Sequence, residues 1–211
     1  EDHEMCEEER CRTAWHEAGH AIAMCELFPD AKLDYVSIVP TEEGALGFVA
    51  TNMDEQRNCM SRPDIINRIA VCLAGRVAEK MAPGLPVEDA VNSGASSDLR
   101  RATQLAYGAV TSLGMSEEFG EVSVEGLPQW IAIAHEMGGN SRMQIDSFID
   151  SGREKAVEIL TQKKEMLQGL AELLLKEDSL DGADVQKLIT GVEKTPSVGA
   201  MEKPSPKSEP N

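Results

Sequence analysis

Residues 14–22 of the chain read Ala-Trp-His-Glu-Ala-Gly-His-Ala-Ile, an H-E-x-x-H motif set in apolar sequence. Its two histidines, His16 and His20, are four residues apart. Four residues advance about 400° around an α-helix, so both imidazoles lie on one face, where two neutral rings can bind one metal ion. Glu17 lies beside that face, where a carboxylate can reach a metal-bound water. The stretch therefore predicts a helix that carries a metal site.

An alternative interpretation is that the motif holds two ordinary histidines with an unrelated glutamate between them. The neighbouring positions argue against it, because they are apolar and would bury both rings: Ala14, Trp15, Ala18, Ala21, Ile22, Cys25 and Leu27. A buried pair of imidazoles without a partner costs free energy, and a metal ion removes that cost. The motif is typical of zinc peptidases, and it predicts His16 and His20 as Zn²⁺ ligands and Glu17 as the catalytic base.

The composition is that of a helical globular protein. The chain has 211 residues, enough for one fair-sized domain or two small ones. Aromatic residues are few, while frequent Ala, Leu, Ile and Met favour a helical core. A formal net charge of −17 argues against a nucleic-acid-binding surface. No apolar run approaches transmembrane length, so we expect no membrane segment in this chain.

The cysteines and the first residue bear on where the protein works. There are five cysteines, an odd number without a C-x-x-C pair, which indicates a reducing compartment. No signal peptide is recognised. The chain opens with Glu1 rather than Met, which is consistent with a fragment of a longer protein.

Periodicity and turn residues predict a mainly α fold with a small β element. Helices are expected over residues 2–28, 62–82, about 96–113, 127–137 and a short last stretch ending near 189. Residues 141–176 are expected to form one long helix or two in a hairpin. Strands are expected over 33–39 and 45–50. We expect one edge of their sheet to lie near the metal, because peptidases commonly hold substrate as an added strand.

The domain organisation follows from the distribution of apolar residues. We expect one metallopeptidase domain over residues 1–193. Residues 194–211 are rich in Pro, Lys, Ser and Glu, and this tail is expected to be disordered. Ser61 and Asp64 resemble a capping box at the start of the second helix, and Pro63 suits its first turn.

The identity of a third ligand is less evident. A catalytic zinc usually has three protein ligands and an open position for water. The metzincin spacing would need Gly at position 23 and His at position 26, where this chain has Ala23 and Glu26, so that class is excluded. The remaining candidates are Glu79, Asp89, Asp98 and His135.

Each candidate also has an ordinary structural interpretation. His135 has no second motif around it, and Asp89 lies in a sequence typical of a loop. Glu79 follows Arg76 by three residues, as in a helical ion pair. Asp98 starts the third helix, where a carboxylate complements the helix dipole. The residues themselves therefore favour an acidic third ligand without choosing between Glu79 and Asp98.

Residues 13–21, Thr-Ala-Trp-His-Glu-Ala-Gly-His-Ala, resemble the start of the peptidase domain of the FtsH family, the membrane-anchored AAA+ zinc metalloproteases. Three more blocks resemble this family in the same order, residues 73–79 (Leu-Ala-Gly-Arg-Val-Ala-Glu), 93–103 and 114–116, and an acidic ending follows near 180–182. The resemblance covers roughly residues 7–190.

The resemblance implies Asp98 as the third Zn²⁺ ligand and Glu79 as a carboxylate beside a ligating histidine. It implies an FtsH-type peptidase domain, a helical bundle around the HEAGH helix. The implied function is a zinc-dependent endopeptidase that hydrolyses unfolded polypeptides as the proteolytic part of an ATP-dependent, homohexameric protease. Two alternatives are a catalytically silent zinc-binding scaffold and a metal-free helical assembly domain.

The chain also departs from the family pattern. No G-x-x-x-x-G-K-[ST] motif occurs, so the ATPase module is not in these residues. Residues 52–63 match poorly, and Phe148 stands where the family usually has Glu. By resemblance, the full-length protein is expected to be anchored in a bacterial inner membrane or an organelle membrane. The peptidase domain is then expected on the cytoplasmic, matrix or stromal side.

Overall fold

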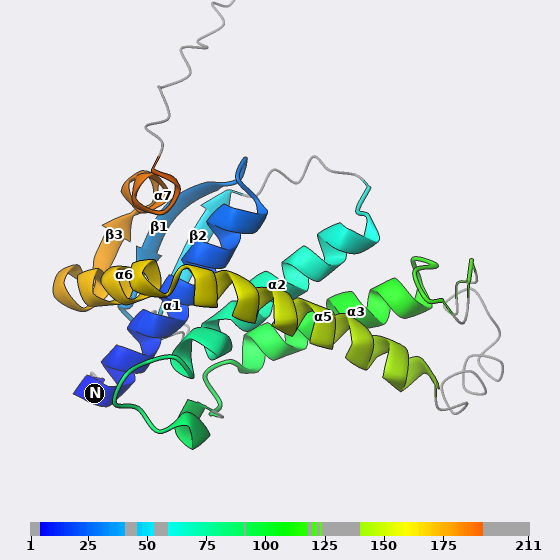
Figure 1. The fold of residues 1–211 in the computed structure, drawn as a ribbon, viewed down its shortest axis with the longest axis horizontal. Coiled ribbons are helices and arrows are strands. Elements are labelled where there is room, and N and C mark those ends of the chain that lie inside the picture. The colour runs from blue at the N-terminus through cyan, green and yellow to red at the C-terminus, as the bar shows by residue number, and fades with distance from the viewer. Residues whose placement is uncertain are drawn as a thin grey trace, which may run out of the picture.

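The computed structural model describes residues 5–40, 46–52, 59–90, 92–117, 120–121, 123 and 140–191. Its helices are α1 (Glu7–Leu27), α2 (Arg62–Glu79), the short 3₁₀ helix η1 (Val87–Ala90), α3 (Ser96–Thr111), α5 (Asn140–Gln162), α6 (Lys164–Glu177) and α7 (Gly182–Thr190). Helix α1 packs against α2 and α6, and α5 packs against α2 and α3 (Figure 1). The prediction of a mainly α fold with a small β element is confirmed. None of the described helices is long and apolar enough to span a bilayer.

Within the described residues, the sheet has three antiparallel strands in the order β2-β1-β3. The central strand β1 (Lys32–Ser37) pairs with β2 (Phe48–Asn52) on one side and β3 (Ser179–Asp181) on the other, with Val36 opposite both Val49 and Leu180. Both predicted strands form, and β3 is an additional strand that the sequence did not predict. Three residues are too few to show an alternating pattern. Among the described strands, β2 is an edge strand next to α1 (Figure 1).

The helix ends follow local hydrogen bonds. The predicted capping box at α2 is confirmed, because Ser61 N–H donates to Asp64 Oδ2 (2.9 Å) and Asp64 N–H donates to Ser61 Oγ (3.3 Å). Helix α1 begins at Glu7 rather than near residue 2, and Cys6 N–H donates to Glu9 Oε2 at its start. Helix α2 ends at Glu79, three residues earlier than predicted.

The long helical stretch is neither one helix nor a hairpin. Lys163 alone separates α5 from α6, with φ −104° and ψ 24°. The N–H of Lys163 still donates to Ile159 O, and Lys163 O accepts from the N–H of Leu167. The two helices therefore follow one another at a local irregularity (Figure 1). The helix predicted over 127–137 and the tail 194–211 lie outside the described residues.

The core has two parts that meet along α2. One joins α1, α6, α7 and the sheet, and the other joins α2, α3 and α5. Helices α1 and α2 approach closely at Gly19, where an added Cβ would lie 2.6 Å from Cβ of Ala78 and 2.7 Å from the carbonyl oxygen of Ala74. Phe148, the departure from the family pattern, is a core residue, and the Arg62 guanidinium lies 4.9 Å from its ring centre. The close α1–α2 contact places the H-E-x-x-H face against residues 71–79.

Candidate active site

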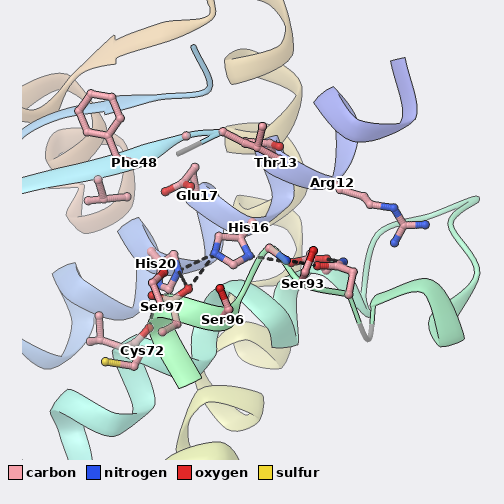
Figure 2. Close-up of a pocket in the computed structure, with 18 of the residues that line it drawn as sticks. Arg12, Thr13, His16, Glu17, His20, Phe48, Cys72, Ser93, Ser96 and Ser97 are labelled. Atoms are coloured by element: carbon pink, nitrogen blue, oxygen red, sulfur yellow. Dashed lines mark hydrogen bonds and ion pairs between the residues drawn. The ribbon is translucent and has the colours of Figure 1, made fainter. Parts of the chain in front are cut away.

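Three side chains from two helices meet beside α2. Helix α1 presents His16 and His20 on one face, with their Nε2 atoms 2.9 Å apart. Asp98, in the first turn of α3, places Oδ2 3.2 Å from Nε2 of His16 and 3.3 Å from Nε2 of His20. Within the described ranges this is the group of His, Cys, Asp or Glu residues that could hold a metal ion. Figure 2 shows the two rings turned toward each other at this point.

The other ring nitrogens fix the tautomers. Nδ1–H of His16 donates to Glu79 Oε1 (2.7 Å), and Nδ1–H of His20 donates to the Val71 carbonyl (2.8 Å). Both partners are acceptors, so each neutral ring must carry its proton on Nδ1. Two Nε2 lone pairs and a carboxylate oxygen then converge. Three acceptors at such short range require a cation between them, either a proton or a metal ion.

The pKa values of His16 and Asp98 reflect this arrangement. Burial alone would lower the pKa of His16, but hydrogen bonds to Asp98 and Glu79 outweigh it and raise the pKa to about 10. Burial alone would raise the pKa of Asp98, but hydrogen bonds from His16 and His20 hold it below its usual range. Without a metal ion, a proton on His16 therefore supplies the positive charge that the site needs.

Glu17 lies next to this group and beside Gly47, the residue just before β2. Its side chain is buried, and burial raises its pKa, against the opposing charges of His20 and His16. A Cβ at Gly47 would lie 2.9 Å from both Cγ and Oε1 of Glu17 and 2.7 Å from Cγ2 of Thr13. Glycine at this position therefore lets the chain pass directly over the carboxylate. In Figure 2, Glu17 lies between the histidine pair and the strands.

Gly75 of α2 lies against the histidine pair itself. A Cβ at Gly75 would lie 2.6 Å from Cε1 and Nε2 of His16 and from Nε2 of His20. These separations are shorter than van der Waals contact, so only glycine leaves room for both rings in their present positions. This residue is part of the 73–79 block, but its spacing from the histidines could not be read from the sequence.

The site opens into a cleft of about 1440 Å³. Its lining includes apolar residues: Met24, Phe28, Leu46, Phe48, Val49, Val71 and Leu105. It also includes acidic residues from the start of α1 and from η1: Glu8, Glu9, Glu88 and Asp89. Arg12 lines the cleft as well, with its guanidinium 2.8 Å from Glu8 and 3.5 Å from Asp89. A peptide can therefore approach both the histidines and Glu17.

The four candidates for a third ligand occupy different places. Asp98 joins the two histidines, and Glu79 is one step further out, on Nδ1 of His16. Asp89 pairs with Arg12 instead, and His135 lies outside the described residues. The ion pair expected between Arg76 and Glu79 is not found, because Nη2 of Arg76 donates to the backbone carbonyl of Asn92 (2.9 Å).

Sequence reasoning missed three contacts of the site. They are the Val71 carbonyl, the close approach of Gly75, and the Asn92 amide, which donates from Nδ2 to Glu79 Oε2 (2.8 Å). A backbone carbonyl carries no signal in the residue type. Asparagine is common in loops, and a glycine inside a helix such as Gly75 indicates close packing without identifying the partner, so neither residue type pointed to the metal site.

An H-E-x-x-H helix whose histidines meet a distant carboxylate beside a buried glutamate has the architecture of a metallopeptidase domain. Residues 3–188 match the model of peptidase family M41. The chain belongs to peptidase family M41, and the resemblance to FtsH proteins is confirmed.

Three relatives illustrate the match. The chain is 34% identical over 196 residues to ATP-dependent zinc metalloprotease FtsH 3 of Petrotoga mobilis, which covers 88% of this chain and 30% of that protein. It is 34% identical over 194 residues to ATP-dependent zinc metalloprotease FtsH of Ruminiclostridium cellulolyticum, covering 87% and 30%. It is 28% identical over 200 residues to ATP-dependent zinc metalloprotease FtsH 4 of Synechocystis, covering 90% and 31%. The chain thus spans about 30% of the length of the curated relatives it matches.

Proposed function

We propose that this chain is a zinc-dependent endopeptidase domain that hydrolyses peptide bonds of unfolded polypeptides, as the proteolytic part of an ATP-dependent protease. The observation that carries the proposal is the convergence of His16 Nε2, His20 Nε2 and Asp98 Oδ2 within 3.3 Å of one another. The names of the relatives, zinc metalloproteases, support the same metal.

The donor set fits zinc. Two imidazole nitrogens and one carboxylate oxygen are ordinary ligands of a catalytic Zn²⁺, which leaves a fourth position for water. Tetrahedral ligands at 2.0–2.1 Å from an ion lie about 3.4 Å from one another. The two separations to Asp98, 3.2 and 3.3 Å, agree with that value, and the histidine pair at 2.9 Å needs to open by a few tenths. His16, His20 and Asp98 are therefore the proposed ligands.

Glu17 is proposed as the general base. Zinc, when bound, lowers the pKa of a water molecule and polarises the scissile carbonyl. Glu17 accepts the proton of the attacking water and then gives it to the leaving amine. Burial raises the pKa of this carboxyl, which strengthens it as a proton acceptor for the water.

The edge of β2 is proposed to hold the peptide. In the described part of the chain β2 pairs with β1 on one side only, and Phe48 and Val49 of β2 line the cleft. Gly47, just before β2, lies over Glu17. A substrate added as a further strand would run past the proposed base, and its backbone would be held by hydrogen bonds that do not depend on its sequence.

The decisive experiment measures zinc and turnover on the same preparation. Protein purified without chelator should contain about one Zn²⁺ per chain and should cleave an unfolded casein-derived peptide, and EDTA should remove both properties. Zinc without turnover would favour the silent scaffold, and no zinc at all would favour the assembly domain. A folded protein substrate should resist cleavage, because these residues contain no nucleotide-binding P-loop.

The assembly and its location are part of the proposal. We expect the full-length protein to form a homohexamer anchored in a membrane, with this domain on the cytoplasmic, matrix or stromal side. In the described part of the chain, Cys6, Cys11, Cys59 and Cys72 form no disulfide, which agrees with a reducing compartment. The mass of the particle that carries this chain in cell extracts would test the hexamer.

Zinc uptake should release a proton. In the metal-free protein His16 has its pKa raised to about 10, so it is protonated at pH 7, whereas a ligating imidazole must be neutral. The apparent zinc affinity should therefore rise about tenfold for each pH unit between pH 6 and 8. Calorimetric titrations in buffers of different ionisation enthalpy should report about one proton released per ion. A buffer-independent enthalpy would show that His16 is already neutral.

Replacing Glu79 should weaken metal binding without removing a ligand. Glu79→Gln keeps an acceptor for Nδ1–H of His16 but removes the charge that makes the ring a stronger donor to a metal. We expect zinc affinity to fall about 10- to 100-fold, measured by competition with a chelator of known affinity. Unchanged affinity would mean that this carboxylate has no influence on the site.

A further inference from the structure

We propose that Asn92 is a positioning residue of the zinc site: its side-chain amide holds the Glu79 carboxylate against His16 and so fixes the orientation of that ring. The inference deepens the proposed function and rests on it. Asn92 is a loop residue. It is not a proposed ligand, and its hydrogen bonds in the structure go to residues other than the two histidines.

Glu79 is held through both of its oxygens. Oε1 accepts from Nδ1–H of His16 at 2.7 Å, and Oε2 accepts from Nδ2 of Asn92 at 2.8 Å. The side chain of Glu79 is buried, with 4% of its surface exposed. A buried carboxylate with one partner would keep an unsatisfied oxygen and could rotate away from the ring. The amide satisfies that oxygen and opposes the rotation.

The orientation of the Asn92 amide is itself fixed. Its Oδ1 accepts from the N–H of Gly94 at 2.8 Å, and Nδ2 also donates to the carbonyl of Asp89 at 3.1 Å. The backbone carbonyl of Asn92 accepts from Nη2 of Arg76 at 2.9 Å. A flipped amide would place its oxygen against Glu79 Oε2 and its NH₂ group against the N–H of Gly94. Only the present orientation therefore satisfies every group.

The loop that contains Asn92 also leads to a proposed ligand. Asp98 follows Asn92 by six positions, and Ala95 between them is buried. One short segment therefore delivers Asp98 to both histidines and, through Glu79, orients His16. The site is assembled correctly only when this segment is in place.

A simpler role for Asn92 would be to shape the loop through its bond to Gly94. Asn92→Ser separates the two roles, because a serine hydroxyl can still accept from Gly94 but is too short to reach Glu79. Asn92→Ala removes both bonds. If Asn92 acts through Glu79, the two variants should have the same effect on the metal site.

The test is a double-mutant cycle on the full chain, with zinc affinity and the visible spectrum of the Co²⁺-substituted protein as readouts. Asn92→Ala and Asn92→Ser should each lower zinc affinity about 10-fold and shift the Co²⁺ absorption bands. In a Glu79→Ala background, Asn92→Ala should change affinity by less than about twofold. If the Glu79→Ala variant does not fold, Glu79→Leu takes its place in the cycle.

The control is Asn67→Ala on α2, which removes an amide that accepts from Lys155 Nζ at 2.6 Å. Asn67 lies about 18 Å along the helix axis from Glu79, so affinity and spectrum should stay at wild-type values. Wild-type behaviour of Asn92→Ser, or a full effect of Asn92→Ala without the Glu79 carboxylate, would overturn the proposal.

A metal-free readout separates this inference from the proposed function. The ¹⁵N shifts of the His16 ring in the metal-free protein should change in Asn92→Ala and Asn92→Ser, but not further once Glu79 is removed. If the wild-type chain bound no zinc but the His16 shifts still depended on Asn92, the proposed function would be refuted and the link from Asn92 to His16 would be supported. If zinc bound and the shifts ignored Asn92, the link alone would be refuted.

Discussion

Glu17→Gln should keep its zinc and lose peptide hydrolysis, with kcat/KM reduced about 10²- to 10⁴-fold. The amide has nearly the same shape as the carboxyl but cannot take a proton from water. The three proposed ligands, His16, His20 and Asp98, are untouched by the change. The measurement is zinc content by elemental analysis, together with cleavage of an unfolded casein-derived peptide by the same sample.

A matched control exists on the same helix. Glu26 also belongs to α1, and it forms an ion pair with Lys163 at 2.9 Å, outside the cleft. Glu26→Gln should leave both zinc content and hydrolysis at wild-type values. Cleavage by Glu17→Gln at the wild-type rate would show that another group is the base.

Gly75→Ala should destroy the metal site while leaving the fold in place. The added Cβ would lie 2.6 Å from atoms of both rings, so His16 or His20 must turn away and the three donor atoms separate. We expect zinc affinity to fall by at least about 100-fold. This is the upper end of the loss seen when a residue that orients a metal ligand is replaced, and here the ligands themselves move. Alanine is also the better helix former by about 1 kcal/mol, so α2 itself should not be weakened.

Gly169→Ala on α6 is the matching control. No atom lies within 4 Å of a Cβ built at Gly169, so the substitution should stabilise the helix and leave zinc binding unchanged. Zinc affinity by chelator competition and thermal unfolding in the presence of EDTA distinguish the two variants. Wild-type zinc affinity in Gly75→Ala would mean that the rings do not meet beside α2.

The sequence predicted what depends on local spacing. The positions of His16 and His20 on one face follow from the helical repeat, and the capping box of Ser61 and Asp64 follows from a three-residue motif. Choosing Asp98 over Glu79 needed the family resemblance. The choice depends on where the first turn of α3 lies relative to α1, a contact between positions 82 residues apart.

Other features depend on tertiary contacts that leave no local pattern. Strand β3 forms because three residues pair with the free edge of β1. The irregularity at Lys163 interrupts a helical pattern of apolar residues that continues on both sides. The carbonyl that orients His20 belongs to Val71, whose side chain gives no hint of that role. Such contacts appear only once the helices are packed.

The separation of 82 residues between His16 and Asp98 has a consequence for unfolding. An ion shared by these side chains would act as a reversible crosslink that closes a long loop of the chain, and closing such a loop removes conformational freedom from the unfolded ensemble. Stripping the ion would then first release the start of α3 from α1, before the alanine-packed contact between α1 and α2 gives way. The same ion would thus stabilise the part of the cleft formed by α1 and the start of α3 against heat and denaturant.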